Sequence, residues 1–351
     1  MDGGGARIPV VDAHCDTVHR MLRGHPFLEG SPEDQVDLPR LREGGVRFQV
    51  FALWVEPDFK PERALGRALQ LWDALQRTVD RSGGRLRLCR RAADLGAARN
   101  EVGVGAIVGL EGAEAIGTDL SVLRALHALG LRVLGLTWNE RNALADGAGE
   151  ARAGGGLTAA GRSVVAECNR LGIVLDASHL CERSFWDLLE HSRQPVIASH
   201  SNAHALCPHE RNLRDEQIRA LAAAGGVMGC NFYAAFLDPD PGRADVGRVC
   251  DHIDHVCAVA GPRHIGLGSD FDGIARAPRG LEDCSRFPAV AEELLRRGHP
   301  AEDVGRILGG NFLRVFRGVW ADGATEGGGG DGPAGEAAAS EDAAPGGGPG
   351  S

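Results

Sequence analysis

The sequence predicts a single (β/α)8 barrel, and three observations support this fold class. The chain has 351 residues, which exceeds an average domain but lies within the range of single barrels wrapped by helices. Short apolar runs of the buried-strand type alternate with longer amphipathic segments, a pattern typical of βα units in a parallel sheet. Eight such runs occur, and eight parallel strands close a barrel of this type.

The eight predicted strands are nearly continuous in apolar or small residues, as strands covered on both faces must be. In chain order they are residues 8–11, 48–55, 105–110, 132–137, 173–176, 196–199, 226–231 and 265–268. Residues 85–89 form another short run of this kind and are a candidate for a ninth strand.

Amphipathic segments that favour helices fall between these strands, at residues 61–81, 120–129, 158–171, 182–191, 213–224 and 245–260. Several stop at a glycine, such as Gly130 and Gly172, which is the usual residue after a helix C-terminus. Two more helices, at residues 289–297 and 301–316, complete a barrel domain that we place at residues 1–320.

The last segment, residues 321–351, differs from the rest in composition. It is rich in Gly, Ala, Pro and acidic residues and has no apolar periodicity that would offset the entropy of ordering. We therefore predict a disordered tail. An acidic docking peptide is the alternative interpretation.

Charge, cysteine content and apolar runs exclude several classes of protein. The formal net charge of −10 and the lack of a Lys/Arg cluster disfavour a nucleic-acid surface. The nine cysteines are scattered without a C-x-x-C, which indicates reduced, mostly buried thiols. No run approaches the roughly 18 apolar residues of a membrane span, and the N-terminus lacks the features of a signal peptide. We expect a cytoplasmic protein with no membrane partner; the oligomeric state stays open, a homodimer included.

Polar residues follow five of the predicted strands, at the end where barrel enzymes carry their active sites. They include His14, Asp16, Glu111, His179, His200 and Asp270. His14 and Asp16 stand two apart, so in an extended strand both side chains point to the same side. A strand-end pair of this kind can equally cap a loop, but convergence with the other strand ends favours a metal site. Imidazole and carboxylate ligands without sulfur suit zinc or another divalent first-row metal.

A second pattern of histidines, His252 and His255, also looks like a metal motif. It falls inside an amphipathic helix, where polar residues usually form the solvated face. We therefore do not expect these two histidines to bind a metal.

The sequence resembles the membrane dipeptidase (renal dipeptidase) family of the amidohydrolase superfamily over about residues 10–319. The resemblance is carried, in order, by VVDAHCDTV, GLEGAE, LDASHL, IASHSNA, Arg211-Asn212, CNFY and LGSDFDGI. It implies a site for two zinc ions. By position, one ion would be held by His14 and Asp16 and the other by His179 and His200, with Glu111 bridging both.

The resemblance also implies roles for residues around the metals. Arg211 matches the family arginine that grips the free carboxylate of the substrate, a task suited to a planar, always charged group. Without the family, a surface salt bridge is the usual role of such an arginine. Tyr233, the only tyrosine, would line the substrate pocket. Asp270 is the candidate that takes a proton and returns it to the departing amine, while Asp272 is expected to form a turn.

The implied function is zinc-dependent hydrolysis of dipeptides with a free C-terminal carboxylate, by a hydroxide that bridges the two metals. Trp138 departs from the family pattern, because mammalian members carry a histidine there that helps to bind the transition state. An indole N–H donates but cannot carry a proton, so the oxyanion contact comes from Trp138, Asn139, Arg141 or Asn142, or is absent.

Two alternatives remain at the level of sequence. One keeps the binuclear metal site but assigns another bond, such as a lactone or a non-peptide amide. The other is a barrel that has lost catalysis and serves as a binding module, against which the intact ligand set argues. The side-chain preference of the pocket and the identity of the metal are not readable from the residues.

Overall fold

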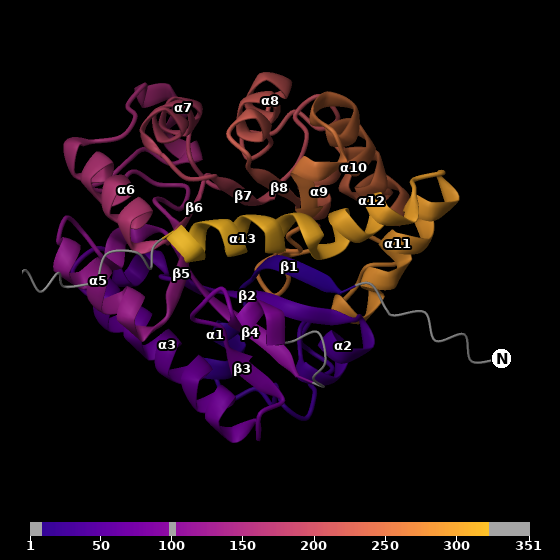
Figure 1. The fold of residues 1–351 in the computed structure, drawn as a ribbon, viewed down its shortest axis with the longest axis horizontal. Coiled ribbons are helices and arrows are strands. Elements are labelled where there is room, and N and C mark those ends of the chain that lie inside the picture. Colours follow the sequence, from indigo (N-terminus) through magenta and orange to yellow (C-terminus); the bar gives the residue numbers. More distant parts are fainter. Residues whose placement is uncertain (1–8, 98–102, 323–351) are drawn as a thin grey trace, which may run out of the picture.

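The structure, a computed structural model that describes residues 9–97 and 103–322, is a closed barrel of parallel strands surrounded by helices (Figure 1). The ring closes because β1 pairs with both β9 and β2, and β2 pairs in turn with β4. The predicted fold is therefore confirmed. Its eight strands are β1 (Val10–Cys15), β2 (Val46–Trp54), β4 (Val104–Glu111), β5 (Leu131–Gly135), β6 (Val174–Asp176), β7 (Ile197–Ser201), β8 (Val227–Cys230) and β9 (Ile265–Leu267).

The ninth predicted strand also exists, as β3 (Leu86–Leu88), but it lies outside the ring. It pairs in parallel with the first half of β4, from Val104 to Ala106, whereas β5 pairs with the second half. A three-residue strand beside a longer one thus adds to the sheet without breaking the barrel.

The longer helices lie within a few residues of their predicted positions, because local capping chemistry sets their ends. For α5, the Asp119 side chain accepts a hydrogen bond from the backbone N–H of Ser121, and Gly130 ends the helix at φ 116°. The set comprises α3 (Ala64–Arg81), α5 (Leu120–Leu129), α6 (Ala159–Leu171), α7 (Glu182–His191), α8 (Asp215–Ala223), α10 (Val246–Ala260) and α11 (Phe287–Arg296).

Four short helices were not predicted, because four to six residues are too few to show a helical period. They are α1 (Val18–Leu22), α2 (Leu38–Glu43), α4 (Asp94–Ala97) and α9 (Ala234–Leu237). Two of them, α1 and α9, border the site described below.

The single helix predicted at residues 301–316 is wrong in detail. The chain forms α12 (Ala301–Gly305), a π-helical turn (Arg306–Gly310) and α13 (Asn311–Asp322). A Cβ on Gly309 would lie 2.5 Å from the carbonyl oxygen of Pro9, so glycine is what lets this turn pack against the start of β1. Sequence periodicity does not report such a close approach.

Helix α13 crosses the barrel, as the yellow helix in the middle of Figure 1 shows. Its Phe312 and Phe316 are fully buried and stack with ring centroids 5.9 Å apart. They belong to one apolar cluster with residues from the first halves of the strands, such as Val11, Val174 and Ile197. α13 therefore closes the N-terminal end of the barrel and leaves the C-terminal end for the site.

The cysteines, the end of the domain and the lack of a membrane span were also predicted from the sequence. All nine cysteines are free and all but Cys257 are buried, as predicted for reduced thiols. Helix α13 extends two residues beyond residue 320, where we placed the end of the domain. The rest of the predicted tail, residues 323–351, lies outside the described residues, and so does residue 8, the first residue of the first predicted strand. In the described ranges, no helix combines the length and apolarity needed to cross a membrane.

Candidate active site

His14 and His200 lie within strands rather than after them, which corrects the predicted strand ends at residues 11 and 199. The sequence suggested loops because polar residues follow the apolar runs. In the structure, Asp12 is fully buried in β1 and accepts hydrogen bonds from the backbone N–H and the hydroxyl of Ser269, each 2.7 Å long. These distant partners allow the strand to continue through polar residues.

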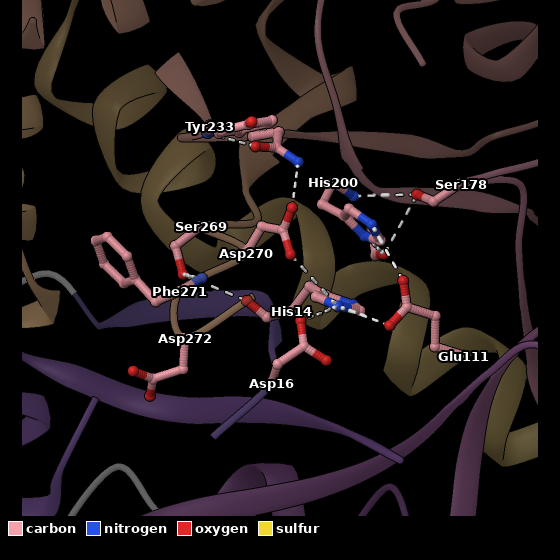
Figure 2. Close-up of polar contacts among 12 residues, drawn as sticks. His14, Asp16, Glu111, Ser178, His200, Tyr233, Ser269, Asp270, Phe271 and Asp272 are labelled. Atoms are coloured by element: carbon pink, nitrogen blue, oxygen red, sulfur yellow. Dashed lines mark hydrogen bonds and ion pairs between the residues drawn. The ribbon is translucent and has the colours of Figure 1, made fainter. Parts of the chain in front are cut away.

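The side chains of His14, Asp16 and His200 lie around that of Glu111, the last residue of β4, at the C-terminal end of the barrel (Figure 2). His14 Nε2 lies 3.4 Å from Glu111 Oε2, and His179 Nε2 lies 2.8 Å from Glu111 Oε1. His200 Nε2 lies 3.6 Å from that same Oε1 and 2.9 Å from His179 Nε2. The two oxygens of one carboxylate thus face histidines from both halves of the predicted ligand set.

Two further carboxylates approach the first half of this group. His14 Nε2 lies 3.7 Å from Asp16 Oδ2 and 3.9 Å from Asp270 Oδ1. His14 Nε2 and Asp16 Oδ1 are buried and have no hydrogen-bond partner among the described residues. Such orphaned atoms are rare in a folded protein unless something else satisfies them. A divalent cation would do so, and these nitrogen and oxygen donors suit one.

Ligand atoms gather in two overlapping groups, each within 4.8 Å: His14 with Glu111 and His200, and His14 with Asp16 and Asp270. Burial raises the pKa of Asp270 to about 7, and the nearby charges of Asp16 and Glu111 add to this rise against the opposing charge of His14. The carboxylates of Asp16, Glu111 and Asp270 have side chains that are at most 15% exposed, so they repel each other, and bound cations would remove that cost.

The outer nitrogens of two histidines are held by residues that the sequence did not single out for this purpose. His179 Nδ1 is 2.7 Å from Asn139 Oδ1, and His200 Nδ1 is 2.7 Å from the hydroxyl oxygen of Ser199. The Ser199 hydroxyl donates to the buried carboxylate of Asp176, so it must accept from His200. With Nδ1–H donating outward, Nε2 of each ring keeps a lone pair for the site.

Residues at this site have backbone φ angles in the left-handed region. Of the described residues, three other than glycine have a positive φ: His179 at 68°, Asp270 at 62° and Asp272 at 66°. A strained backbone conformation of this kind costs roughly 1–3 kcal/mol and tends to cluster at functional sites. Two of the three are predicted site residues, and Asp272 lies in the same loop as Asp270 and anchors it.

Asp272 fulfils the structural role that the sequence suggested. Its carboxylate accepts a 2.7 Å hydrogen bond from the hydroxyl of Thr17 and a 2.8 Å bond from the backbone N–H of Gln35. The side chain is fully buried. These bonds tie the loop that carries Asp270 to the segment after β1.

Arg211 is buried, with 5% of its surface exposed, which contradicts the alternative of a surface salt bridge. One guanidinium N–H donates to the backbone oxygen of His200 at 3.2 Å, and Nε has no partner among the described residues. Burial lowers the pKa of Arg211, and the charges of Asp270 and Glu111, which act in the opposite direction, only partly offset it. A buried cation of this kind is poised to bind an anion.

Of the four residues that could supply the oxyanion contact, two line the cavity of the site and two are bonded elsewhere. Trp138 and Asn139 line the site cavity, which has a volume of about 370 Å³ and is also lined by Arg211 and Tyr233. Arg141 instead forms an ion pair with Asp146. The Asn142 amide donates to the backbone oxygen of Leu136 at 2.8 Å and accepts from the backbone N–H of Leu144. Of the four candidates for the oxyanion contact, only Trp138 and Asn139 therefore reach the cavity.

His252 and His255 lie outside the site, but the expected solvated face is wrong for His252. That ring is fully buried, accepts from the backbone N–H of Ala203 and lies 2.8 Å from the oxygen of Leu237. His255 pairs with Asp215 at 2.8 Å. Both histidines have structural partners on neighbouring elements that the helix pattern alone does not reveal.

Comparison with known proteins decides the family. The model of the membrane dipeptidase family (peptidase family M19) matches residues 5–325. The chain belongs to this family. A dipeptidase of Aspergillus oryzae is 34% identical over 88% of this chain and 78% of its own length, and an uncharacterized dipeptidase of Schizosaccharomyces pombe is 36% identical over 88% and 80%.

A solved structure extends the similarity to three dimensions. A metallopeptidase from Rhodobacter sphaeroides, bound to a phosphinate mimic of the dipeptide L-Ala-D-Ala, superimposes with a TM-score of 0.85 at 34% identity. The match covers 89% of this chain and 99% of that one. The protein is thus a metallo-dipeptidase, a hydrolase of peptide bonds, and the resemblance noted from the sequence motifs is confirmed.

Proposed function

We propose that this dipeptidase holds two zinc ions and hydrolyses dipeptides that have a free C-terminal carboxylate. His14 and Asp16 would hold one ion, His179 and His200 the other, and Glu111 would bridge them. The observation that carries the proposal is the position of Glu111, whose two oxygens face histidines of the two halves at 3.4 and 2.8 Å. Such a bridge needs one carboxylate between two groups of ligands.

Two ions held here would lower the pKa of a water molecule toward neutrality and polarise the scissile carbonyl. The protein must then move a proton from the attacking water to the departing amine. We assign this step to Asp270, which lies beside His14 and is oriented by a 2.9 Å hydrogen bond from the Asn231 amide. The Asp270 carboxylate lies within the group of ligand atoms formed with His14 and Asp16.

The substrate would be positioned by residues of the cavity wall. Arg211 would bind the C-terminal carboxylate through its guanidinium, whose Nε–H has no partner among the described residues. Asn139 has its carbonyl oxygen committed to His179, so its amide N–H groups are available for the oxyanion together with the Trp138 indole. Tyr233 would form part of the wall around the substrate side chains. The dipeptide mimic bound by the Rhodobacter relative supports this class of substrate.

A metal analysis combined with a panel of L-L and L-D dipeptides tests the proposal. We expect about two zinc ions per chain and turnover of members of the panel. Fewer than about two metals with no turnover of any member would contradict it. Turnover of lactones or non-peptide amides alone would favour the alternative binuclear hydrolase, and stoichiometric binding without turnover would favour the non-catalytic barrel. The cytoplasmic location and the homodimer remain predictions.

A further inference from the structure

Two arginines, Arg20 in α1 and Arg23 at the C-cap of that helix, line the same cavity as the metal group. α1 begins two residues after Asp16, and both Arg20 and Arg23 border the cavity. The two residues are three apart, and Arg23 keeps a right-handed helical conformation (φ −80°, ψ 0°), so both side chains lie on the same side of this turn. We call the part of the cavity lining formed by Arg20 and Arg23 the arginine wall. Neither arginine has a role in the proposed reaction.

Arg20 is fixed at the wall by carboxylates that lie beneath it. Its Nε is 3.6 Å from Asp34 Oδ1 and 4.0 Å from Asp272 Oδ1. The Arg20 side chain is 33% exposed, whereas the Asp34 and Asp272 side chains are 1% and 0% exposed. Because the acids are covered, the wall presents the guanidinium to the cavity.

Arg23 is exposed and forms no ion pair with any residue that the structure describes. The carboxylates that border the cavity are all committed elsewhere. Asp16, Glu111 and Asp270 belong to the ligand group, and Asp272 accepts from Thr17 and Gln35. A positively charged substrate side chain would find no free acid at this wall, whereas a negatively charged one would find two arginines.

We infer that this dipeptidase prefers dipeptides with an acidic side chain, whose carboxylate binds Arg20 and Arg23 while Arg211 binds the C-terminal carboxylate. The inference rests on the proposed function, since it adds a second anionic group to the same substrate. Arg20 and Arg23 are then specificity-determining residues, and Arg23 is the one with no competing partner in the described structure.

The test compares isosteric substrates on the metal-loaded enzyme. We expect kcat/KM for Ala-Glu or Glu-Ala, with either enantiomer of the C-terminal residue, to exceed that for the matching Gln dipeptide by roughly fivefold, the size of a partly exposed ion pair. Arg23→Gln should bring this ratio close to one. Because the contact is partly exposed, raising the salt concentration should also lower the ratio in the wild type.

Arg77→Gln is the matched control, because Arg77 is an exposed helical arginine that pairs with Asp73 and does not border the cavity. It should leave the ratio of the acidic to the amide substrate unchanged. A wild-type ratio of one or less, or a ratio that Arg23→Gln does not change, would overturn the inference while turnover of the Gln dipeptides still upholds the proposed function. No turnover of any dipeptide would overturn both.

Discussion

Replacing Arg211 by methionine should make the protein more stable and less active. Methionine keeps an unbranched apolar stem but removes the charge and every N–H donor. The substitution therefore separates the packing of this residue from its binding capacity. Arg211 is 5% exposed, and within the described part of the chain its Nε is unpartnered and its side chain donates one hydrogen bond, to the backbone oxygen of His200.

The expected magnitudes follow from this environment. An unsatisfied buried donor costs about 1–3 kcal/mol, and a typical hydrogen bond contributes about 1 kcal/mol. The difference between these two terms is up to about 2 kcal/mol, so Arg211→Met should stabilise the metal-free protein by that amount and raise Tm by up to about 3 °C. The loss of charged hydrogen bonds to a substrate carboxylate, about 3 kcal/mol in all, should lower kcat/KM for a dipeptide about 100-fold.

Thermal unfolding of the metal-free protein and kinetics on a dipeptide and its C-terminal amide measure these two effects. The amide lacks the carboxylate, so Arg211→Met should slow its hydrolysis far less than that of the dipeptide. Arg77→Met, at an exposed position, controls for the general loss of an arginine. An equal loss on both substrates would refute the assigned contact, and a lower Tm would show that Arg211 is a structural residue.

Three other substitutions test the hydrogen bond that orients His200, the buried histidine of α10, and the packing of α13 at the N-terminal end of the barrel. Ser199→Ala removes the hydrogen-bond partner of His200 and should weaken metal binding about 10- to 100-fold in a chelator competition; unchanged affinity would contradict the orienting role. Burial lowers the pKa of His252 from 6.5 to about 4. As the pH falls, the unfolded chain therefore takes up a proton at this histidine before the folded protein does. The free energy of unfolding should decrease by up to about 3 kcal/mol between pH 6.5 and pH 4. In urea unfolding, His252→Gln should flatten this dependence, and equal slopes would argue against it. Phe316→Ala should cost about 3–5 kcal/mol in urea unfolding and leave kcat/KM of the folded enzyme unchanged, because α13 closes the opposite end of the barrel; a loss of kcat/KM would contradict that separation.

His14, Glu111, His179 and His200 could be found from sequence because barrel strands deliver polar residues to one rim. The strand ends were wrong at His14, because its neighbour Asp12 is satisfied by Ser269, 257 residues away in the chain. A local pattern cannot report a partner at that separation.

The sequence by itself determined the barrel, the order of its strands and longer helices, and the identity of the residues at its C-terminal rim, because these depend on periodicity and caps within short windows. The tertiary structure alone decided the outward partners of the histidine rings, the burial of Arg211 and the place of Arg20 and Arg23 on the cavity wall. These features arise from contacts between segments far apart in the chain. Such contacts exist only after the barrel has closed.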